Sequence, residues 1–130
     1  MALKIALDTN CYRDFCAGDR EVLDLVQLAE RVVLPFVTLA ELRAGFRCGT
    51  RAAENERVLQ RFLHRPRVDV LYASEDTTRH YAQLFAQLRR QGTPIPVNDL
   101  WIAALVIEHG LDLLSRDGHF DHLPQLPRVA

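Results

Sequence analysis

The sequence predicts an α/β fold with a mainly parallel sheet flanked by helices. Short apolar runs alternate along the chain with longer segments whose apolar residues recur at helical spacing. This alternation is typical of βαβ units, whose parallel strands are buried on both faces. No internal repeat, low-complexity tract or linker interrupts the pattern, so we expect a single domain over residues 1–130, a length that fits one compact unit.

Five apolar runs are expected to form the strands. The first is apolar except for Lys4 and ends abruptly in Asp8. The second contains VVLPF, and Pro35 indicates that this strand ends there or lies near an edge of the sheet. The expected strands span residues 3–7, 31–36, 68–72, 111–114 and 126–129.

Capping residues and glycines mark the helices of the first half. A short helix is expected over residues 11–17, and Asp19 is expected to cap a second over about residues 20–30. Thr38 is a plausible N-cap for a third helix, which ends at Gly49.

Three more helices are expected in the second half. One spans about residues 51–64, with apolar residues on one face and arginines on the next. Ser74 precedes another, over residues 76–91. The last opens at Asn98 or Asp99 and is apolar nearly all round (WIAALVI), so it should lie centrally.

Composition excludes several broad classes of protein. With 48% hydrophobic and 25% charged residues, the chain should bury a core and is not a disordered segment. No apolar run approaches the roughly 20 residues that span a bilayer, and the N-terminal segment is too short for a signal peptide, so we expect a cytoplasmic protein. The 3 cysteines form no CxxC pair, which suggests neither a disulfide framework nor a zinc site. We expect them to be ordinary buried or half-buried thiols.

Four acidic residues stand where ligand sites gather in parallel sheets, beyond strand ends or early in helices. Asp8 follows the first strand, and Asp117 follows the run LDLL at a short distance. Glu41 and Asp99 lie early in helices, beside apolar residues. Carboxylates brought together would repel one another unless a cation neutralised them. Mg²⁺ or Mn²⁺, which prefer oxygen ligands, would be the simplest remedy.

Each acid also has a purely structural interpretation. Asp8 could cap a helix or turn the chain after its strand, and Asp99 could be an N-cap. Glu41 could complete a capping box with Thr38, because the two have the T-x-x-E spacing of that motif. Asp117, with the glycine that follows it, could form an ordinary turn. A shared metal site is a stronger interpretation than any one of these, because it explains why all four acids lie after strands or early in helices.

Other enzymes that react with phosphate groups require residues that this chain lacks. Phosphoryl transfer to an enzyme aspartate usually recruits a lysine, and the only lysine here is Lys4, inside the first strand. This argues against receiver domains and haloacid-dehalogenase-like phosphatases. The latter also require an aspartate where this chain has Asn10. No GxxxxGK[ST] motif is present, which excludes a P-loop. A small metal-dependent phosphatase stays open as an alternative.

Three segments carry the acids: ALDTN, TLAELRAG, and VNDLWIAALVIEHGLDLLSRDGHF, the last preceded by TPIP. In their order and spacing the chain resembles, over essentially its whole length, a PIN-domain ribonuclease of the VapC toxin type. The resemblance implies a three-layer α/β/α sandwich and metal-dependent endonucleolytic cleavage of RNA. The positions that match the family's acidic quartet are Asp8, Glu41, Asp99 and Asp117. Positions where polar residues often support that quartet are Thr9, Asn10 and Ser115.

The resemblance also implies roles for the four acids. Asp8 and Asp99 are expected to bind Mg²⁺ or Mn²⁺ directly, and Glu41 to be a ligand or the base that orients water. Asp117 is expected to bind a second metal or to act through water. Hydrolysis by metal-activated water in line with the leaving oxygen gives a 5′-phosphate and a 3′-hydroxyl. The sequence leaves both one and two metal ions open.

Partners are likewise implied by the resemblance. A small VapB-like antitoxin usually holds such toxins inactive, and a homodimer is expected, which becomes a heterotetramer or larger assembly with the antitoxin. The RNA substrate could be tRNA, rRNA or mRNA, and no membrane is involved. The alternative function is a weakly catalytic or DNA-directed PIN protein that acts as the partner of a DNA-binding repressor.

Basic charge is local rather than global. The net charge of −1 gives no overall field that attracts nucleic acid, but seven arginines lie between residues 43 and 67 against two acids. They could follow a phosphate backbone, receive an acidic antitoxin tail, or form a solvated face. The candidates for RNA or antitoxin contact are Arg43, Arg47, Arg57, Arg61 and Arg65.

Overall fold

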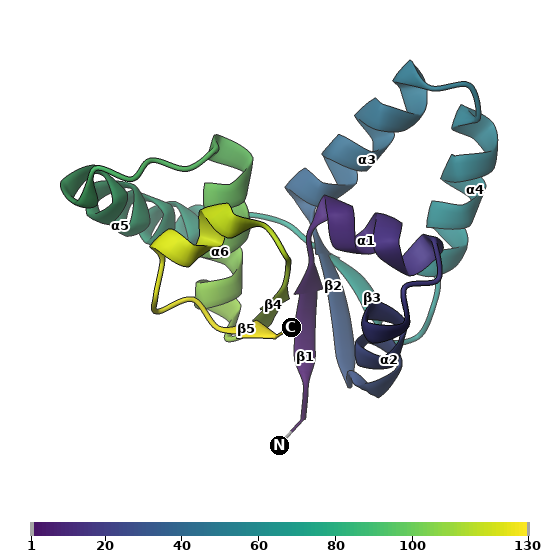
Figure 1. Cartoon of the computed structure of the whole chain (residues 1–130), viewed down its shortest axis with the longest axis horizontal. Helices are drawn as coiled ribbons and strands as arrows, with labels where there is room; N and C mark the ends of the chain where they lie inside the picture. Colours follow the sequence, from purple (N-terminus) through teal and green to yellow (C-terminus); the bar gives the residue numbers. More distant parts are fainter. Residues whose placement is uncertain (1, 130) are drawn as a thin grey trace.

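A five-stranded sheet forms the middle of the molecule, and helices cover both of its faces (Figure 1). The computed structural model describes residues 2–129. All neighbouring strands are parallel, in the order β3-β2-β1-β4-β5. The strands are β1 (Lys4–Leu7), β2 (Arg31–Pro35), β3 (Val68–Leu71), β4 (Asp112–Leu114) and β5 (Arg128–Val129). The predicted three-layer α/β/α architecture is confirmed.

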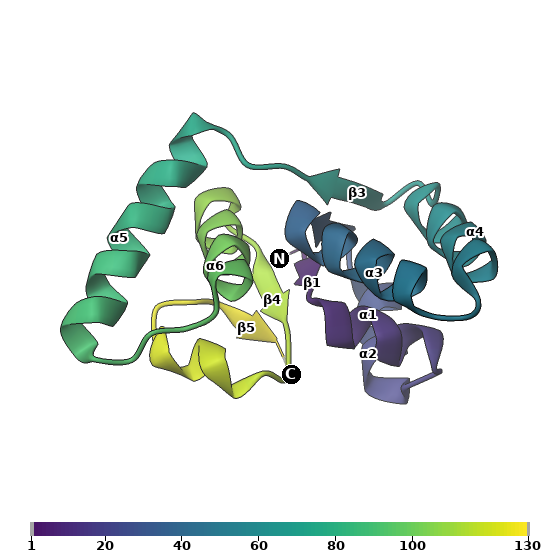
Figure 2. The same ribbon diagram turned by 90° about the horizontal axis from the view of Figure 1, so that it is seen from above.

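Helices α1 to α4 lie toward one side of the molecule, and α5 and α6 lie toward the other (Figures 1 and 2). The helices of the described residues are α1 (Thr9–Cys16), α2 (Arg20–Leu28), α3 (Phe36–Cys48), α4 (Ala52–Leu63), α5 (Glu75–Gln91), α6 (Val97–His109) and the 3₁₀-helix η1 (Gly118–His122). Within residues 2–129, no helix has the length and apolar character needed to cross a membrane.

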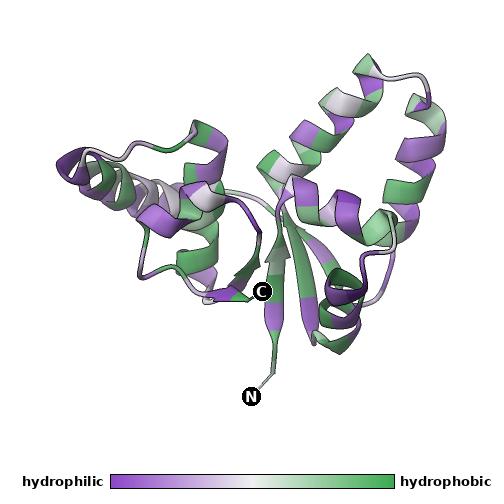
Figure 3. Ribbon diagram, viewed as in Figure 1, coloured by the Kyte–Doolittle hydropathy of each residue, from purple (hydrophilic) through white to green (hydrophobic). Residues whose placement is uncertain are grey.

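Successive residues of the strands face opposite helical layers. Ile5 and Leu7 of β1 pack in the cluster formed with α1, α2 and α4, whereas Ala6 between them packs in the cluster formed with α5 and α6. The same alternation occurs in β2, where Val33 faces the α6 side. Because both faces are covered, β1, β2 and β4 are apolar after their first residues, as expected for a parallel sheet (Figure 3).

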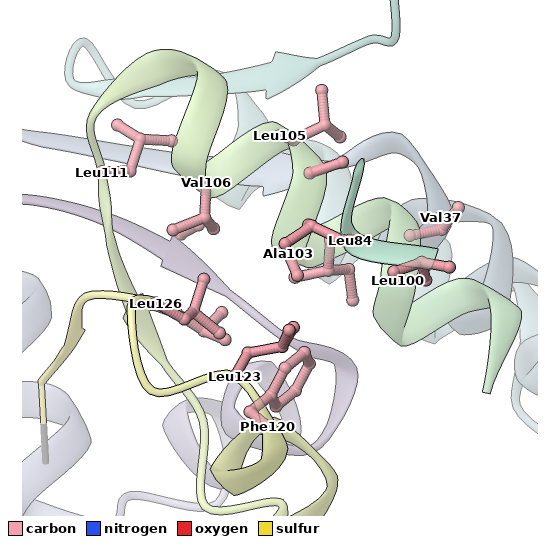
Figure 4. Close-up of a cluster of buried hydrophobic side chains, with 14 of the residues drawn as sticks. Val37, Leu84, Leu100, Ala103, Leu105, Val106, Leu111, Phe120, Leu123 and Leu126 are labelled. Carbon is pink, nitrogen blue, oxygen red and sulfur yellow. The ribbon is translucent and has the colours of Figure 1, made fainter. Parts of the chain in front are cut away.

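Helix α6 is central, as its sequence predicts. The residues from Ile102 to Val106 are all buried, so the helix is enclosed on nearly every side. Figure 4 shows Ala103 and Val106 of α6 among side chains from α5 and η1, including Leu84 and Phe120. This packing fixes the N-terminal turn of α6 relative to the strands.

The start of α3 differs from the prediction. Thr38 was expected to be its N-cap, but the helix begins at Phe36 and Thr38 is buried inside it. The Thr38 hydroxyl donates a hydrogen bond of 3.1 Å to the carbonyl of Leu7 on β1, instead of capping a helix N–H. Pro35 takes the N-cap position and ends β2, an interior strand, so it marks a strand end and not an edge.

Helix α6 shows the same arrangement. It begins at Val97 after Pro96, rather than at Asn98 or Asp99, so Asp99 lies in the first turn and is not the N-cap. Proline suits both positions because its fixed φ and missing N–H are tolerated where a helix begins.

Two of the three cysteines are not buried as expected. Cys11 is buried in α1, but Cys16 and Cys48 are exposed because they lie at the C-terminal ends of α1 and α3. All three thiols are free, in agreement with the absence of a disulfide framework.

Candidate metal centre

The sheet has a switch point between β1 and β4. From β1 the chain adds β2 and β3 on one side, and then crosses through α5 and α6 to place β4 on the other side of β1. In open α/β sheets, ligand sites form at such a point, outside the carboxyl ends of the strands. Asp8 follows β1 directly and Asp117 follows β4 closely, so both acids stand at this edge.

A polar pocket of about 350 Å³ opens at the switch point, and all four predicted acids line it. Asp8 comes from the end of β1, Glu41 from α3, Asp99 from the first turn of α6, and Asp117 from the segment before η1. An adjoining hollow shares three of these acids and adds His119. The structure therefore brings together residues from four separate segments, while their roles as ligands or catalysts stay predictions.

Asp8 is fixed through both of its carboxylate oxygens. Oδ1 accepts a hydrogen bond of 2.8 Å from the N–H of Cys11 and so caps α1. Oδ2 accepts a hydrogen bond of 2.5 Å from the hydroxyl of Ser115. Because a carboxylate oxygen has two lone pairs, these bonds leave capacity for a metal ligand. Asp8 thus caps a helix, as its structural interpretation predicted, and still lines the pocket.

Ser115 and Thr9 hold three of the four acids. The buried Ser115 hydroxyl also accepts a hydrogen bond of 3.1 Å from the backbone N–H of Asp117. Thr9 donates a hydrogen bond of 2.8 Å to Oε1 of Glu41. Glu41 therefore bonds to Thr9 and does not form the capping box that its structural interpretation predicted. Asn10 is exposed and lines the same pocket.

The pKa of Asp99 is raised to about 6. Burial is the largest cause, followed by the negative charge of Asp117; Glu41 and Asp8 add to it, and the nearby His119 opposes it. A carboxyl group whose charged form is disfavoured by neighbouring acids gains most when a cation binds among them. A cation bound in the pocket would therefore offset the cost of charging Asp99.

His119 is a member of this pocket that the sequence prediction did not include. Its Nδ1 lies 2.9 Å from Oδ1 of Asp117 and 3.2 Å from Oδ2 of Asp99. The backbone N–H of His119 also donates a hydrogen bond of 2.9 Å to Oδ1 of Asp117. The signal in the sequence was its position in SRDGHF, but nothing there indicated that a 3₁₀-helix would turn the imidazole toward α6.

Arg116, also absent from the prediction, holds the segment between β4 and η1 against the start of α2. Its guanidinium lies 2.9 Å from carboxylate oxygens of both Asp19 and Glu21, and 3.1 Å from Asp14. The hydrogen bond from Arg116 is the main reason that the pKa of Asp19 falls to about 2. Because Arg116 lies between Ser115 and Asp117, this network anchors the backbone on which those two residues stand.

Two of the five predicted arginines, Arg43 and Arg65, contact other side chains of the protein. Arg43 makes a bidentate ion pair with Glu56, with distances of 3.1 and 3.0 Å, and so links α3 to α4. Arg65 lies over the rings of Phe15 and Phe62, 5.4 and 5.5 Å from their centroids. The remaining exposed candidates are Arg47, Arg57 and Arg61. Arg13, which was not predicted, lines both the acidic pocket and an adjoining groove.

Comparisons with known proteins agree with the geometry. The family model described as the PIN domain matches residues 5–126, a range that contains all four acids. Ribonuclease VapC5 of Mycobacterium tuberculosis is 31% identical over 114 residues, which cover 88% of this chain and 83% of that protein. Ribonuclease VapC1 of Haemophilus influenzae is 38% identical over 94 residues, which cover 67% of this chain and 69% of that protein.

Two solved complexes are similar over almost the whole chain. VapBC-1 from nontypeable Haemophilus influenzae has a TM-score of 0.85 and 28% identity, and the match covers 98% of this chain and 97% of that one. DNA-bound VapBC from Salmonella typhimurium has a TM-score of 0.85, 27% identity and the same coverage, 98% and 97%. The likeness therefore includes every segment that contributes an acid to the pocket.

Proposed function

This chain belongs to the PIN domain family as a VapC-type ribonuclease toxin, and we propose that it hydrolyses phosphodiester bonds within RNA by a metal-dependent reaction at the four-acid pocket. The observation that carries the proposal is the convergence of Asp8, Glu41, Asp99 and Asp117 on one pocket at the switch point of the sheet. When bound there, a divalent cation neutralises charge on the phosphodiester and lowers the pKa of a water molecule.

The donor set fits Mg²⁺ or Mn²⁺. Carboxylate oxygens are the ligands that these hard cations prefer, and they bind with few protein ligands while keeping several waters. Asp8 and Asp99 would hold the ion, with Asp117 close enough to Asp99 to raise its pKa and so to share the charge. The raised pKa of Asp99 supports this assignment, because burial and then the charge of Asp117 disfavour the charged carboxylate, and a bound cation would offset both.

Glu41 is the residue that we assign to accept a proton from the attacking water. It is the most exposed of the four acids, and Thr9 restrains its Oε1 so that the carboxylate stays at the pocket. A base must lie within hydrogen-bond reach of the water that it activates, and an oriented carboxylate at the open side of the pocket meets that requirement. The expected products carry a 5′-phosphate and a 3′-hydroxyl.

Arg13 is our candidate for the contact to the phosphate next to the cleaved bond. Its side chain lines the wall of the acidic pocket and continues into the groove between α1, α3 and α4. Gly45 makes room for it, because a Cβ there would lie only 3.1 Å from Nη2 of Arg13. Guanidinium groups pair well with phosphate oxygens, so the exposed Arg47, Arg57 and Arg61 would extend this contact along the RNA.

A VapB-like antitoxin is the partner of this toxin, as in the VapBC complexes that it resembles. We place the antitoxin in the groove between α1, α3 and α4, whose apolar lining includes Tyr12, Leu42 and Phe46. Arg65, which follows α4, is exposed and can meet an acidic segment of the antitoxin, whereas Arg43 would first have to leave its ion pair with Glu56. We further propose that the toxin is a homodimer in the cytoplasm. With the antitoxin, it forms a heterotetramer or a larger assembly.

The test is cleavage of structured RNA by the purified chain, freed of antitoxin, with Mg²⁺ or Mn²⁺. We expect internal cuts that Asp8→Asn abolishes, whereas Asp24→Asn, at an exposed position on α2, leaves them unchanged. Equal residual activity in the wild type and Asp8→Asn would favour the alternative, a weakly catalytic partner of a DNA-binding repressor. A parallel DNA substrate tests the DNA-directed form of that alternative. Release of phosphate from monoesters without internal cuts would favour a phosphatase.

A further inference from the structure

The imidazole of His119 faces the same space as two of the proposed metal ligands. Its Nδ1 lies 2.9 Å from Oδ1 of Asp117 and 3.2 Å from Oδ2 of Asp99. One potential ligand atom from each of these three residues lies within 4.8 Å of the other two. Asp117 and His119 are close in the sequence, whereas Asp99 comes from α6, so the meeting of all three depends on the fold.

These separations match those within an octahedral coordination shell. An ion with ligand bonds of about 2.1 Å places neighbouring ligand atoms about 3 Å apart, which is close to both distances from Nδ1. An ion bound by Asp99 and Asp117 could therefore take Nδ1 as an adjacent ligand after only small movements of the side chains. Among the described residues, the charged groups paired with the imidazole of His119 are the carboxylates of Asp99 and Asp117.

We propose that His119 is a nitrogen ligand of the metal centre and that it biases the site toward Mn²⁺ over Mg²⁺. This inference rests on the proposed metal-dependent function and deepens it. The four acids supply oxygen ligands only, which suit both ions. Imidazole nitrogen favours transition-metal ions, whereas Mg²⁺ strongly prefers oxygen. A single nitrogen donor in an otherwise oxygen-based site therefore changes which ion is preferred.

A different role for His119 makes a different prediction. If the imidazole only donates hydrogen bonds to Asp99 and Asp117, its loss changes the affinities for Mg²⁺ and Mn²⁺ by the same factor, because both ions meet the same carboxylates. If it is a ligand, the ratio of the two affinities changes. The ratio thus separates coordination from support of the carboxylates.

The experiment measures metal binding to the protein alone, without RNA. Calorimetric titration with Mn²⁺ and with Mg²⁺ is expected to show that His119→Ala weakens Mn²⁺ binding by about tenfold or more and Mg²⁺ binding by less than about threefold. His119→Asp, which offers oxygen instead of nitrogen, should lower the preference for Mn²⁺ while keeping the affinity for Mg²⁺. His122→Ala, at an exposed position on the same 3₁₀-helix, is the matched control and should bind both ions as the wild type does.

A second measurement needs no variant. Electron spin-echo envelope modulation of Mn²⁺ bound to the wild type should show coupling to an imidazole nitrogen, and His119→Ala should lose it. An unchanged affinity ratio together with no nitrogen coupling would overturn the assignment of His119 and leave the proposed function standing. Failure of the wild type to bind either ion would overturn both.

Discussion

The hydroxyl of Ser115 donates a 2.5 Å hydrogen bond to the carboxylate of Asp8, although the two residues are 107 positions apart in the sequence. The same hydroxyl accepts a hydrogen bond from the backbone of Asp117. Asp8 and Asp117 follow two neighbouring strands, so one buried side chain fixes both acids at the switch point. The geometry of the pocket therefore depends on a residue that is not itself an acid of the site.

Ser115→Ala is expected to reduce both stability and activity. It removes a buried donor from Asp8 and an acceptor from Asp117, which should lower the free energy of unfolding by about 1–3 kcal/mol. RNA cleavage should fall by about tenfold or more, since groups that orient metal ligands commonly contribute this much. Urea unfolding and kcat/KM measure the two effects. Ser74→Ala, in the capping box of α5, should lose stability but keep full activity; full activity in Ser115→Ala would contradict the anchoring role.

Thr9→Val tests the restraint on Glu41. The substitution removes the hydroxyl that donates to Glu41 Oε1 and keeps the shape of the side chain. Because the pair is exposed, stability should change by less than about 0.5 kcal/mol. The turnover number should fall several-fold with little change in KM, because a less well oriented base acts mainly on the chemical step. Thr78→Val, at an exposed position on α5, is the control, and an unchanged turnover number in Thr9→Val would refute the assigned role.

Asp99→Asn should stabilise the metal-free protein above pH 6 while it abolishes cleavage. The pKa of Asp99 rises from 3.8 to about 6 on folding, so the folded state binds this proton more tightly than the unfolded state. The stability that Asp99 contributes is therefore complete below about pH 4 and is lost as the pH rises through about 6. Removing the charge should raise Tm at neutral pH by about 3–6 °C, and the gain should disappear below about pH 4.

Thermal unfolding across this pH range checks the prediction. Asp24→Asn, at an exposed position far from the pocket, should show no such pH-dependent gain. Saturating Mg²⁺ should raise the Tm of the wild type more than that of Asp99→Asn, because only the wild type keeps the carboxylate that the ion neutralises. A gain for Asp99→Asn that is the same at every pH would point to packing rather than charge.

The exposed arginines of α4 should contribute salt-dependent affinity for RNA. The double substitution Arg57→Glu and Arg61→Glu is expected to weaken binding and to reduce the slope of log affinity against log salt concentration by about 1–2. The matched charge-reversal variant, Arg89→Glu with Arg90→Glu, lies on α5 at the opposite side of the molecule and should leave the slope nearly unchanged. Fluorescence anisotropy with a catalytically inactive background measures both. Equal slopes in the two variants would indicate that the α4 arginines form a solvated surface and do not contact RNA.

Chelation should remove activity reversibly. A site of carboxylates holds its ion with few protein ligands, so EDTA is expected to strip it and added Mg²⁺ or Mn²⁺ to restore cleavage. Metal binding should also raise Tm in proportion to the logarithm of the metal concentration. Zinc-dependent activity that survives prolonged chelation would contradict the site, because such retention needs a closed shell of nitrogen or sulfur ligands.

Most of the fold could be predicted because each layer leaves a simple pattern in the sequence. Strands buried on both faces read as continuous apolar runs, and Asp19 and Gly49 mark helix ends as expected. The predicted start of α3 was wrong, because Pro35 both ends β2 and precedes the first residue of the helix. Thr38 therefore lies inside α3, where its hydroxyl bonds to β1. Such a choice depends on a neighbouring strand and leaves no local signal.

The convergence of the four acids on one pocket could be predicted, but part of their support could not. Asp8 and Asp117 follow strands and Asp99 lies in the first turn of α6, whereas Glu41 lies in the second turn of α3, later in its helix than predicted. His119 and Arg116 act through long-range contacts set by η1 and by the start of α2, and neither of these follows from spacing along the chain. Residues that hold a site in place are harder to find than the residues that form it.

The order of the segments has a consequence for synthesis of the protein. A chain translated as far as α5 already contains Asp8 and Glu41, but neither Asp99 nor Asp117 has been added. Strand β4 must then pair beside β1 before Ser115 can reach Asp8. On the growing chain, the four-acid pocket therefore stays incomplete until Asp117 has been added and β4 has paired beside β1.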